Sequence, residues 1–136
     1  MAIAFLTREG MDFRVPIRAM ELGRRNSQAW SRSMPVTYLI KFQVVPERRG
    51  EFLELLEGVL DAMRNESMFH EAILHSDPAS ENRFMLYETW ESHEDVLDLQ
   101  LRRPYRQAWH EALPRLLQQE RDITIWQPMR SDRKHH

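Results

Sequence analysis

The sequence predicts an α+β protein with a ferredoxin-like fold, in which helices cover one face of an antiparallel sheet. Three observations predict it. A β-branched and aromatic segment opens the patterned part of the chain, an amphipathic helix follows it, and a hairpin, a broken helix and a short alternating segment complete the chain. The element order is therefore β-α-β-β-α-α-β, which is the split βαβ topology with its second helix in two pieces.

Composition limits the class of protein and of partner. The 136 residues suffice for one ordinary domain, and 42% hydrophobic and 29% charged residues are typical of a globular chain. With a net charge of −2 and no apolar run near the roughly 20 residues that span a bilayer, we expect neither nucleic acid nor a membrane as partner. The absence of cysteine excludes disulfides, iron–sulfur clusters and thiol nucleophiles, and is compatible with the cytoplasmic location that we expect.

Two flanking segments differ from the patterned part of the chain. Residues 1–34 show no sustained strand or helix period and are interpreted as an N-terminal extension of unknown structure. Residues 131–136 are polar, and one interpretation of His135-His136 is the remnant of a cloning tag. The domain is therefore expected over residues 35–130.

The first strand is expected over residues 36–45, where β-branched and aromatic side chains dominate. Alternate residues place one apolar set on a single face: Val36, Tyr38, Ile40, Phe42 and Val44. Pro46 ends the strand and suits the first turn of a helix. The helix that follows carries an apolar stripe at helical spacing: Phe52, Leu55, Leu56, Val59, Leu60 and Met63.

An antiparallel hairpin is expected next. Its strands are predicted over residues 68–76 and 83–90, and residues 77–82, which favour turns, form a longish loop between them. Ser92, followed by Asp95, then predicts the N-cap of a short helix.

The last part of the chain predicts a second helical segment and a strand. Pro104 breaks the helical pattern and opens the new segment, in which Pro114 predicts a kink or an early stop. Residues 123–127 alternate as a final strand. The second helical segment carries the stripe Tyr105, Ala108, Trp109, Ala112, Leu113 and Leu116.

One face of the predicted sheet is left without a helical layer. The strands carry more apolar surface than one thin layer of helices covers, and face-to-face packing of two sheets buries the excess. We therefore expect a homodimer, with a dimeric αβ barrel-like assembly.

A resemblance to a known family is carried by the segment Phe84-Met85-Leu86-Tyr87-Glu88-Thr89-Trp90-Glu91-Ser92, by the helix after it and by Pro104-Tyr105. Together with Asp77-Pro78 and Pro46-Glu47, this pattern resembles the antibiotic biosynthesis monooxygenase (ABM) family and its quinol-monooxygenase relatives. The resemblance covers about residues 35–128 and rests on these positions in combination with the element order.

The resemblance implies a dimeric domain that binds a substrate between the sheet and the helices. The family includes cofactor-free oxygenases of aromatic quinols and polyketides, haem-degrading enzymes and proteins of unproven activity. An electron-rich quinol can itself supply electrons to oxygen, so the protein supplies an apolar pocket, orientation and a base. We therefore expect a cofactor-independent monooxygenase that takes a small aromatic or quinol-like molecule and dioxygen, with no cofactor. A non-catalytic dimeric ligand-binding or accessory domain is the second hypothesis, and a haem-binding or haem-degrading protein is the third.

The sequence departs from the family pattern at positions that bear on activity. Many relatives carry a histidine in the helix after the Trp-x-Ser motif, and Gln100 stands there, which favours the non-catalytic hypothesis. The tryptophan and the iron-binding histidine of the haem-degrading branch match Leu99 and Trp109, with His110 one residue further. Because a shift of one residue turns a helical side chain by about 100°, His110 is expected to point away from the apolar stripe, and haem degradation is disfavoured.

Four residues are candidates for contact with a substrate: Trp90, Gln100, Tyr105 and Trp109. The two tryptophans can stack on an aromatic ring, and the Tyr105 hydroxyl can bond a phenol. Gln100 shares its stripe with Val96, where a polar side chain needs a partner. Each candidate also has a structural interpretation, as part of the core or as a partner of the backbone.

Two residues are candidates for a catalytic base, His70 and Glu88. His70 shares the parity of Ala72 and Leu74 on its strand, so we expect it to face the interior, with His75 on the opposite side.

Glu88 shares a strand face with Trp90, which predicts a partly buried carboxylate that needs hydrogen bonds or a cation. A structural ion pair is the alternative to a catalytic role. His93, near a helix start, is expected in solvent, and no metal is expected because no cluster of ligands with metal-site spacing is present.

Overall fold

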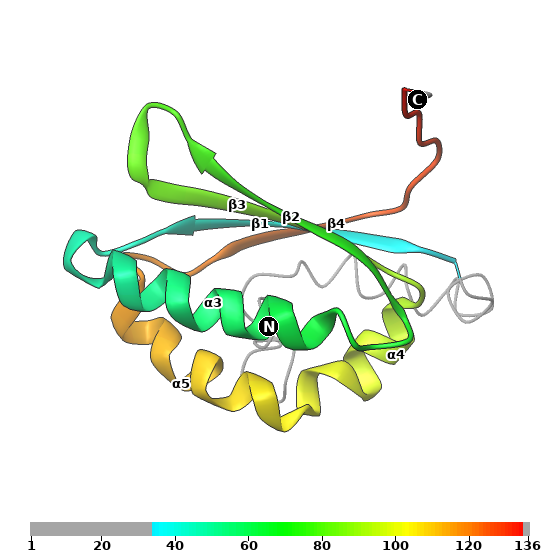
Figure 1. The fold of residues 1–136 in the computed structure, drawn as a ribbon, viewed down its shortest axis with the longest axis horizontal. Helices are drawn as coiled ribbons and strands as arrows, with labels where there is room; N and C mark the ends of the chain where they lie inside the picture. The colour runs from blue at the N-terminus through cyan, green and yellow to red at the C-terminus, as the bar shows by residue number, and fades with distance from the viewer. Residues whose placement is uncertain (1–33, 135–136) are drawn as a thin grey trace.

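A four-stranded antiparallel sheet with helices on one of its faces makes up the computed structural model (Figure 1). The structure describes residues 34–134, so the interpretations of the N-terminal extension up to residue 33 and of His135-His136 lie outside the described residues. The strand order is β2-β3-β1-β4, which is that of the ferredoxin-like fold, and the predicted fold class is confirmed. None of the described helices is long and apolar enough to cross a membrane.

The first strand, β1 (Val36–Gln43), lies at the centre of the sheet. It pairs with β3 (Ser80–Trp90) on one side and with β4 (Asp122–Trp126) on the other. Val44 continues the chain as an isolated bridge to Leu117. The predicted inward set is buried: Val36, Tyr38, Ile40, Phe42 and Val44.

Two helices cover the inward face. The long helix, α3 (Arg49–Met63), follows a short 3-10 turn, η2 (Pro46–Arg48), with Pro46 in its first turn as predicted. Beside it lies α5 (Gln107–Leu116), which ends two residues after Pro114, the predicted early stop (Figure 1). The stripe that α3 buries against the sheet consists of Phe52, Leu56, Val59 and Met63.

Between β3 and α5 the chain forms three short helical pieces. Ser92 Oγ accepts the Asp95 N–H at 3.1 Å and caps α4 (His93–Asp98), so the predicted N-cap is confirmed. The pieces η3 (Gln100–Arg102) and η4 (Pro104–Arg106) follow, and Pro104 cannot donate the hydrogen bond that would continue one helix. We call residues 93–106 the broken helix. It crosses the end of the sheet where β3 ends (Figure 1).

The hairpin of β2 (Phe69–Asp77) and β3 is tighter than predicted. Residues 80–82, expected in a loop, belong to β3, and Asp77 pairs with Ser80. Asp77 Oδ1 accepts the Ala79 N–H at 2.8 Å. This side-chain hydrogen bond stabilises a turn short enough to let the strands extend.

A β-bulge near the start of β2 changes the side-chain alternation. Phe69 pairs with Trp90 and Glu71 pairs with Thr89, so His70 is an extra residue between them. A bulge reverses the alternation of the side chains that precede it. The prediction that His70 faces the interior is therefore wrong, and its side chain is 38% exposed.

Candidate functional site

Polar side chains gather at one end of the layer between the sheet and the helices. This end lies where β1 begins, β3 ends and the broken helix crosses (Figure 1). Because buried polar groups reduce stability unless they are hydrogen-bonded, such a gathering calls for an explanation. We call it the polar end, and its buried members are Tyr38, Glu88, His93, Gln100 and Arg106.

Tyr38 on β1 and His93 at the start of α4 form a buried pair. The Tyr38 hydroxyl and His93 Nδ1 are hydrogen-bonded at 2.7 Å, and which of them donates depends on the imidazole tautomer. Burial raises the pKa of Tyr38 well above its usual value and lowers the pKa of His93 to about 4. Both groups are therefore neutral near pH 7. The expectation that His93 lies in solvent is wrong, because α4 begins directly at the sheet and its first residue turns toward β1.

Glu88, opposite Tyr38 in the sheet, is a fully buried carboxyl group. Trp90 Nε1 donates a hydrogen bond to Glu88 Oε1 at 3.0 Å, whereas Oε2 has no partner among the described residues. Burial raises the pKa of Glu88, and the positive charge of Arg106, the Trp90 N–H and the positive charge of Arg121 partly oppose this effect. The predicted burial is confirmed. Two buried cations, Arg106 and Arg121, are close enough for their charges to act on Glu88.

Arg106, in η4, is a fully buried cation. Its Cζ lies 5.6 Å from the centroid of the Trp90 ring and 5.3 Å from that of the Tyr105 ring. Nη2 donates to the Tyr105 hydroxyl at 3.4 Å, while Nε and Nη1 have no partner among the described residues. The sequence analysis missed Arg106, although it precedes Trp109 by three residues and Leu113 by seven, which places it on their buried stripe.

Glu66, in the loop after α3, binds the broken helix through three side chains. Its Oε1 accepts from Gln100 Nε2 at 3.4 Å and from Arg103 Nη2 at 3.1 Å, and its Oε2 accepts from the Tyr105 hydroxyl at 3.1 Å. Gln100 Nε2 also donates to Asp95 Oδ2 at 3.2 Å, and Gln100 Oε1 has no partner among the described residues. The amide of Gln100 is therefore fixed on one side and unsatisfied on the other.

The structure brings together some of the predicted site residues and separates others. Trp90, Gln100 and Tyr105 contact the polar end or its arginine, together with Glu88. His70 lies outside, where its Nε2 is 2.6 Å from Glu91 Oε1.

Trp109 lies at the opposite, apolar end of the interior. Its ring centroid is 5.9 Å from that of Phe42 and 5.6 Å from that of Phe52, and its Nε1 has no partner among the described residues. Leu99, matched to the tryptophan of haem-degrading relatives, is 43% exposed. Because Leu99 faces outward and Trp109 is packed in the core, these positions do not form a common haem-binding wall.

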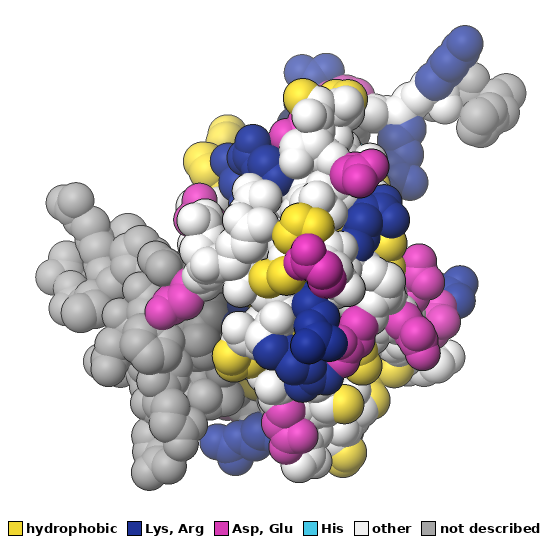
Figure 2. Space-filling view, turned by 90° about the vertical axis from the view of Figure 1, so that its left-hand side faces the viewer, with side chains coloured by type: hydrophobic (Ala, Val, Ile, Leu, Met, Phe, Trp, Pro, Cys, Tyr) yellow, Lys and Arg dark blue, Asp and Glu magenta, His cyan; other side chains and the backbone are white. Residues whose placement is uncertain are grey.

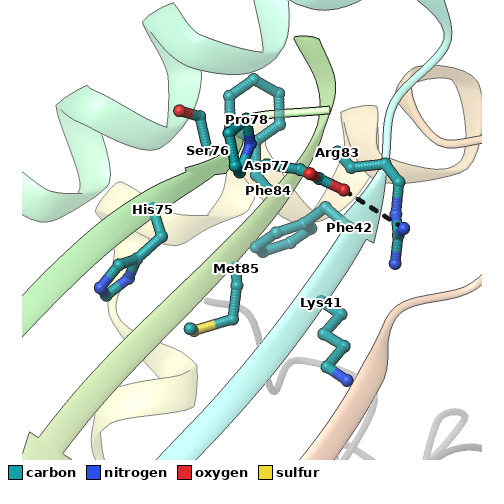
Figure 3. A pocket seen from close by; sticks show the side chains of 9 residues that line it. All are labelled: Lys41, Phe42, His75, Ser76, Asp77, Pro78, Arg83, Phe84 and Met85. Carbon is teal, nitrogen blue, oxygen red and sulfur yellow. Dashed lines mark hydrogen bonds and ion pairs between the residues drawn. The ribbon is translucent and has the colours of Figure 1, made fainter. Parts of the chain in front are cut away.

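A pocket of about 260 Å³ lies elsewhere, at the hairpin end of the sheet (Figure 3). Its charged groups are exposed or paired: Arg83 Nη1 lies 3.3 Å from Asp77 Oδ2. No buried polar atom without a partner lines it, so it offers less specific recognition than the polar end. The lining residues are Lys41, Phe42, His75, Ser76, Asp77, Pro78, Arg83, Phe84 and Met85.

The surface offers no broad field of one sign on the face seen in Figure 2, where acidic and basic side chains alternate. Ion pairs such as Arg48 with Glu51, at 3.5 Å, and Arg115 with the same carboxylate belong to this kind of mixed surface. Among residues 34–134, no group of three or more histidine, cysteine, aspartate or glutamate side chains is placed to hold a metal ion.

Comparison with known proteins agrees with the fold. A family model described as antibiotic biosynthesis monooxygenase matches residues 35–118, more than half of the chain. No curated protein matches the chain. Many solved structures superpose on it at low sequence identity, among them the three that follow. A conserved protein from Methanosarcina mazei Go1 has a TM-score of 0.65 and 20% identity, over 71% of this chain and 95% of the other.

The second structure, Rv0793 from Mycobacterium tuberculosis, has a TM-score of 0.65 and 21% identity, over 71% of this chain and 97% of its own. The third, called antibiotic biosynthesis monooxygenase, has a TM-score of 0.63 and 15% identity, over 70% of this chain and 99% of its own. At identities this low, the three superpositions establish a shared fold alone.

Proposed function

Since this chain belongs to the antibiotic biosynthesis monooxygenase family, we propose that it is a cofactor-independent monooxygenase of a small aromatic, quinol-like molecule. The observation that carries the proposal is the state of Glu88, a fully buried carboxyl group with one oxygen left without a partner among the described residues. A buried base with an unused lone pair suits the removal of a phenolic proton.

In the proposed reaction the quinol supplies the electrons that reduce dioxygen. A hydroquinone with one free ring position and O₂ give a hydroxyquinone and water: one oxygen atom bonds to the ring carbon, and the other leaves as water with two hydrogen atoms. Glu88 would accept a phenolic proton, because burial raises its pKa toward that of a useful base. Trp90, Gln100 and Tyr105 would line the site, as their positions around the polar end support.

Access to the site requires movement, because its polar members are buried. The broken helix is the element suited to move. It consists of α4, η3 and η4, each six residues or shorter, so few backbone hydrogen bonds join one piece to the next. We propose that the substrate enters when this stretch opens, with Glu66 as the contact that closes it again.

Oxygen uptake tests the proposal. Metal-stripped protein is mixed with a panel of hydroquinones and polyphenols under ¹⁸O₂, with autoxidation controls. We expect uptake above autoxidation and one labelled atom in the quinone product. Glu88→Gln should lower the rate by about 100-fold or more, and Gln100→Ala should lower it as well, while Glu54→Gln, an exposed carboxylate on α3, serves as the matched control. Uptake at the autoxidation rate across the panel, or an equal effect of Glu88→Gln and Glu54→Gln, contradicts the proposal.

The outer face of the sheet supports a homodimer. The row Ile73, Tyr87 and Leu39 crosses β2, β3 and β1 in register, and Ile73 remains 44% exposed. Trp126 on β4, at 59% exposure, adds to this apolar surface. A second copy of the chain, packed sheet to sheet, would cover it.

Sedimentation velocity tests the dimer. Ile73→Glu should give a monomer, because it places a charge in the proposed interface. Leu99→Glu is the matched control, since Leu99 is 43% exposed but lies in the broken helix rather than on the sheet. A wild-type chain that sediments as a monomer at high concentration rules the dimer out.

Gln100 favours the second candidate function, a non-catalytic ligand-binding domain. Its side chain cannot titrate, and its amide is held by Glu66 and Asp95. Retention of an aromatic ligand without oxygen uptake would establish this function in place of the oxygenase. A Soret band on haem titration would instead support the haem hypothesis.

A further inference from the structure

Several buried polar atoms of the polar end are left without a hydrogen-bond partner among the described residues. They are Glu88 Oε2, Gln100 Oε1, and Arg106 Nε and Nη1. Buried polar groups in native proteins are almost always satisfied, and each exception reduces stability. Three unsatisfied side chains at one end of one layer therefore indicate a ligand that completes them, rather than independent packing defects.

The two charged members are held close together by one side chain. Trp90 donates its indole N–H to Glu88 Oε1 at 3.0 Å, and the Arg106 guanidinium lies 5.6 Å from the centroid of the same indole. Yet neither the partner of Glu88 Oε1 nor the partner of Arg106 Nη2 is the other residue, although their charges attract each other. A pair whose purpose was structural would make the short, charge-assisted bonds that a guanidinium and a carboxylate form readily. Because they are not bonded to each other, Arg106 has donors and Glu88 has an acceptor that a ligand can bind.

The chemistry of the atoms without a partner indicates what kind of ligand binds here. A guanidinium only donates hydrogen bonds, and an ionised carboxylate only accepts them. We propose that Arg106 and Glu88 form a two-point recognition site for an aromatic molecule that bears both a carbonyl or phenolate oxygen, bound by Arg106, and a hydroxyl group, bound by Glu88. Arg106 is thus a specificity-determining residue for hydroxylated rings that carry a second oxygen acceptor.

Tyr105 and Glu66 fix the arginine for this task. Arg106 Nη2 donates to the Tyr105 hydroxyl at 3.4 Å, and that hydroxyl donates to Glu66 Oε2 at 3.1 Å. One of the guanidinium nitrogens is thereby occupied, whereas Nε and Nη1, which lie on different edges of the planar group, have no partner among the described residues. Either nitrogen can donate a charge-assisted hydrogen bond to an oxygen acceptor of the ligand.

Calorimetric titration at about pH 8, well above the usual pKa of a carboxyl group, tests the inference with probes that do not react with oxygen. The probes are 3- and 4-hydroxyacetophenone, which carry both groups at different separations, acetophenone, which carries the acceptor alone, and phenol, which carries the hydroxyl alone. The wild-type chain should bind one hydroxyacetophenone isomer at least about tenfold more tightly than acetophenone or phenol, because a hydrogen bond to a charged group contributes that much.

Two variants should act on different halves of the ligand. Glu88→Gln should weaken hydroxyacetophenone and phenol by about tenfold and leave acetophenone unchanged, whereas Arg106→Met should weaken hydroxyacetophenone and acetophenone and leave phenol unchanged. If Arg106→Met does not fold, Arg106→Lys, which lacks the planar fork, replaces it. Thermal melts confirm folding before each titration.

Two-point recognition rests on the proposed oxygenase function, and the outcomes of the titration distinguish the two. An equal loss for all ligands, no loss in either variant, or no binding of any probe overturns two-point recognition. If each variant weakens only the ligands that carry the group it binds, but the quinol panel shows no oxygen uptake, two-point recognition stands and the oxygenase is rejected. Oxygen uptake without this selective loss supports the oxygenase and rejects two-point recognition.

Discussion

The two ends of the interior lie under the same sheet and are equally buried, but opposite chemistry fills them. At the apolar end the rings of Phe42, Phe52, Phe84 and Trp109 lie with centroids 5.1 to 5.9 Å apart, at tilted or edge-on angles that aromatic pairs prefer. At the polar end, charged side chains leave oxygen and nitrogen atoms without partners among the described residues.

The difference separates what folds this chain from what it does. Dense aromatic packing stabilises the contact of β1 and β3 with α3 and α5, whereas the unsatisfied groups of Glu88 and Arg106 reduce stability. At the apolar end, Trp109 Nε1 also has no partner among the described residues. A single indole N–H among rings is a smaller penalty than two buried charges.

Truncation at the apolar end should have the largest effect on stability. Phe52→Ala removes a fully buried ring that contacts Phe42, Phe84 and Trp109, and should lower the free energy of unfolding by about 3–5 kcal/mol. Urea unfolding measures the loss. In the fraction that remains folded, affinity for the hydroxyacetophenones should be unchanged. A loss of affinity in the folded fraction would show that the ligand reaches the apolar end, and would contradict the division of roles between the two ends.

At the polar end, the pH dependence of stability should come from His93. Its pKa is lowered to about 4 in the folded chain from a usual 6.5, so the unfolded chain binds the proton first. The contribution of His93 to stability should therefore fall as the pH drops from about 6.5 to about 4, by up to about 3 kcal/mol, while Glu88, whose pKa is raised, contributes with the opposite sign. His93→Gln should flatten this part of the profile. Urea unfolding across these pH values checks it, and an unchanged slope would assign the effect to another group.

The smallest effect is expected at the hairpin pocket. Arg83 and Asp77 lie 3.3 Å apart, but the arginine side chain is 55% exposed. Exposed ion pairs contribute little, so Arg83→Ala should lower the free energy of unfolding by less than about 0.5 kcal/mol. Ligand titration with the same variant should match the wild type. A clear loss of affinity would move the binding site from the polar end to this pocket.

Local patterns predicted the fold, because in each helix or strand the apolar residues recur at the spacing typical of that element. The alternation in β1, the stripe of α3 and the Ser92 cap each predict an element that the structure contains. The turn of the hairpin was predicted too long, since the side chain of Asp77 closes a tighter one.

The site was harder to predict, because its members come from elements far apart in sequence. A bulge cannot be read from alternation, so His70 was placed on the wrong face. His93 gave no signal, because its burial depends on how α4 meets β1 and not on its neighbours in sequence. The burial of Arg106 could be predicted from its helical spacing to Trp109 and Leu113. Tyr105, the residue before it, has an aromatic side chain and was assigned to the buried stripe instead.

We infer that the charges of the polar end serve a ligand and not the fold. The free energy of unfolding of the double variant Glu88→Gln, Arg106→Met tests it most directly. Each single change should lower the free energy of unfolding, because it removes the attraction between the charges of Glu88 and Arg106. The double variant should regain the stability of the wild type to within about 1 kcal/mol, since it removes both charges at once. A double variant that loses as much as the two single variants together would show that the charges hold the fold, and would contradict the account.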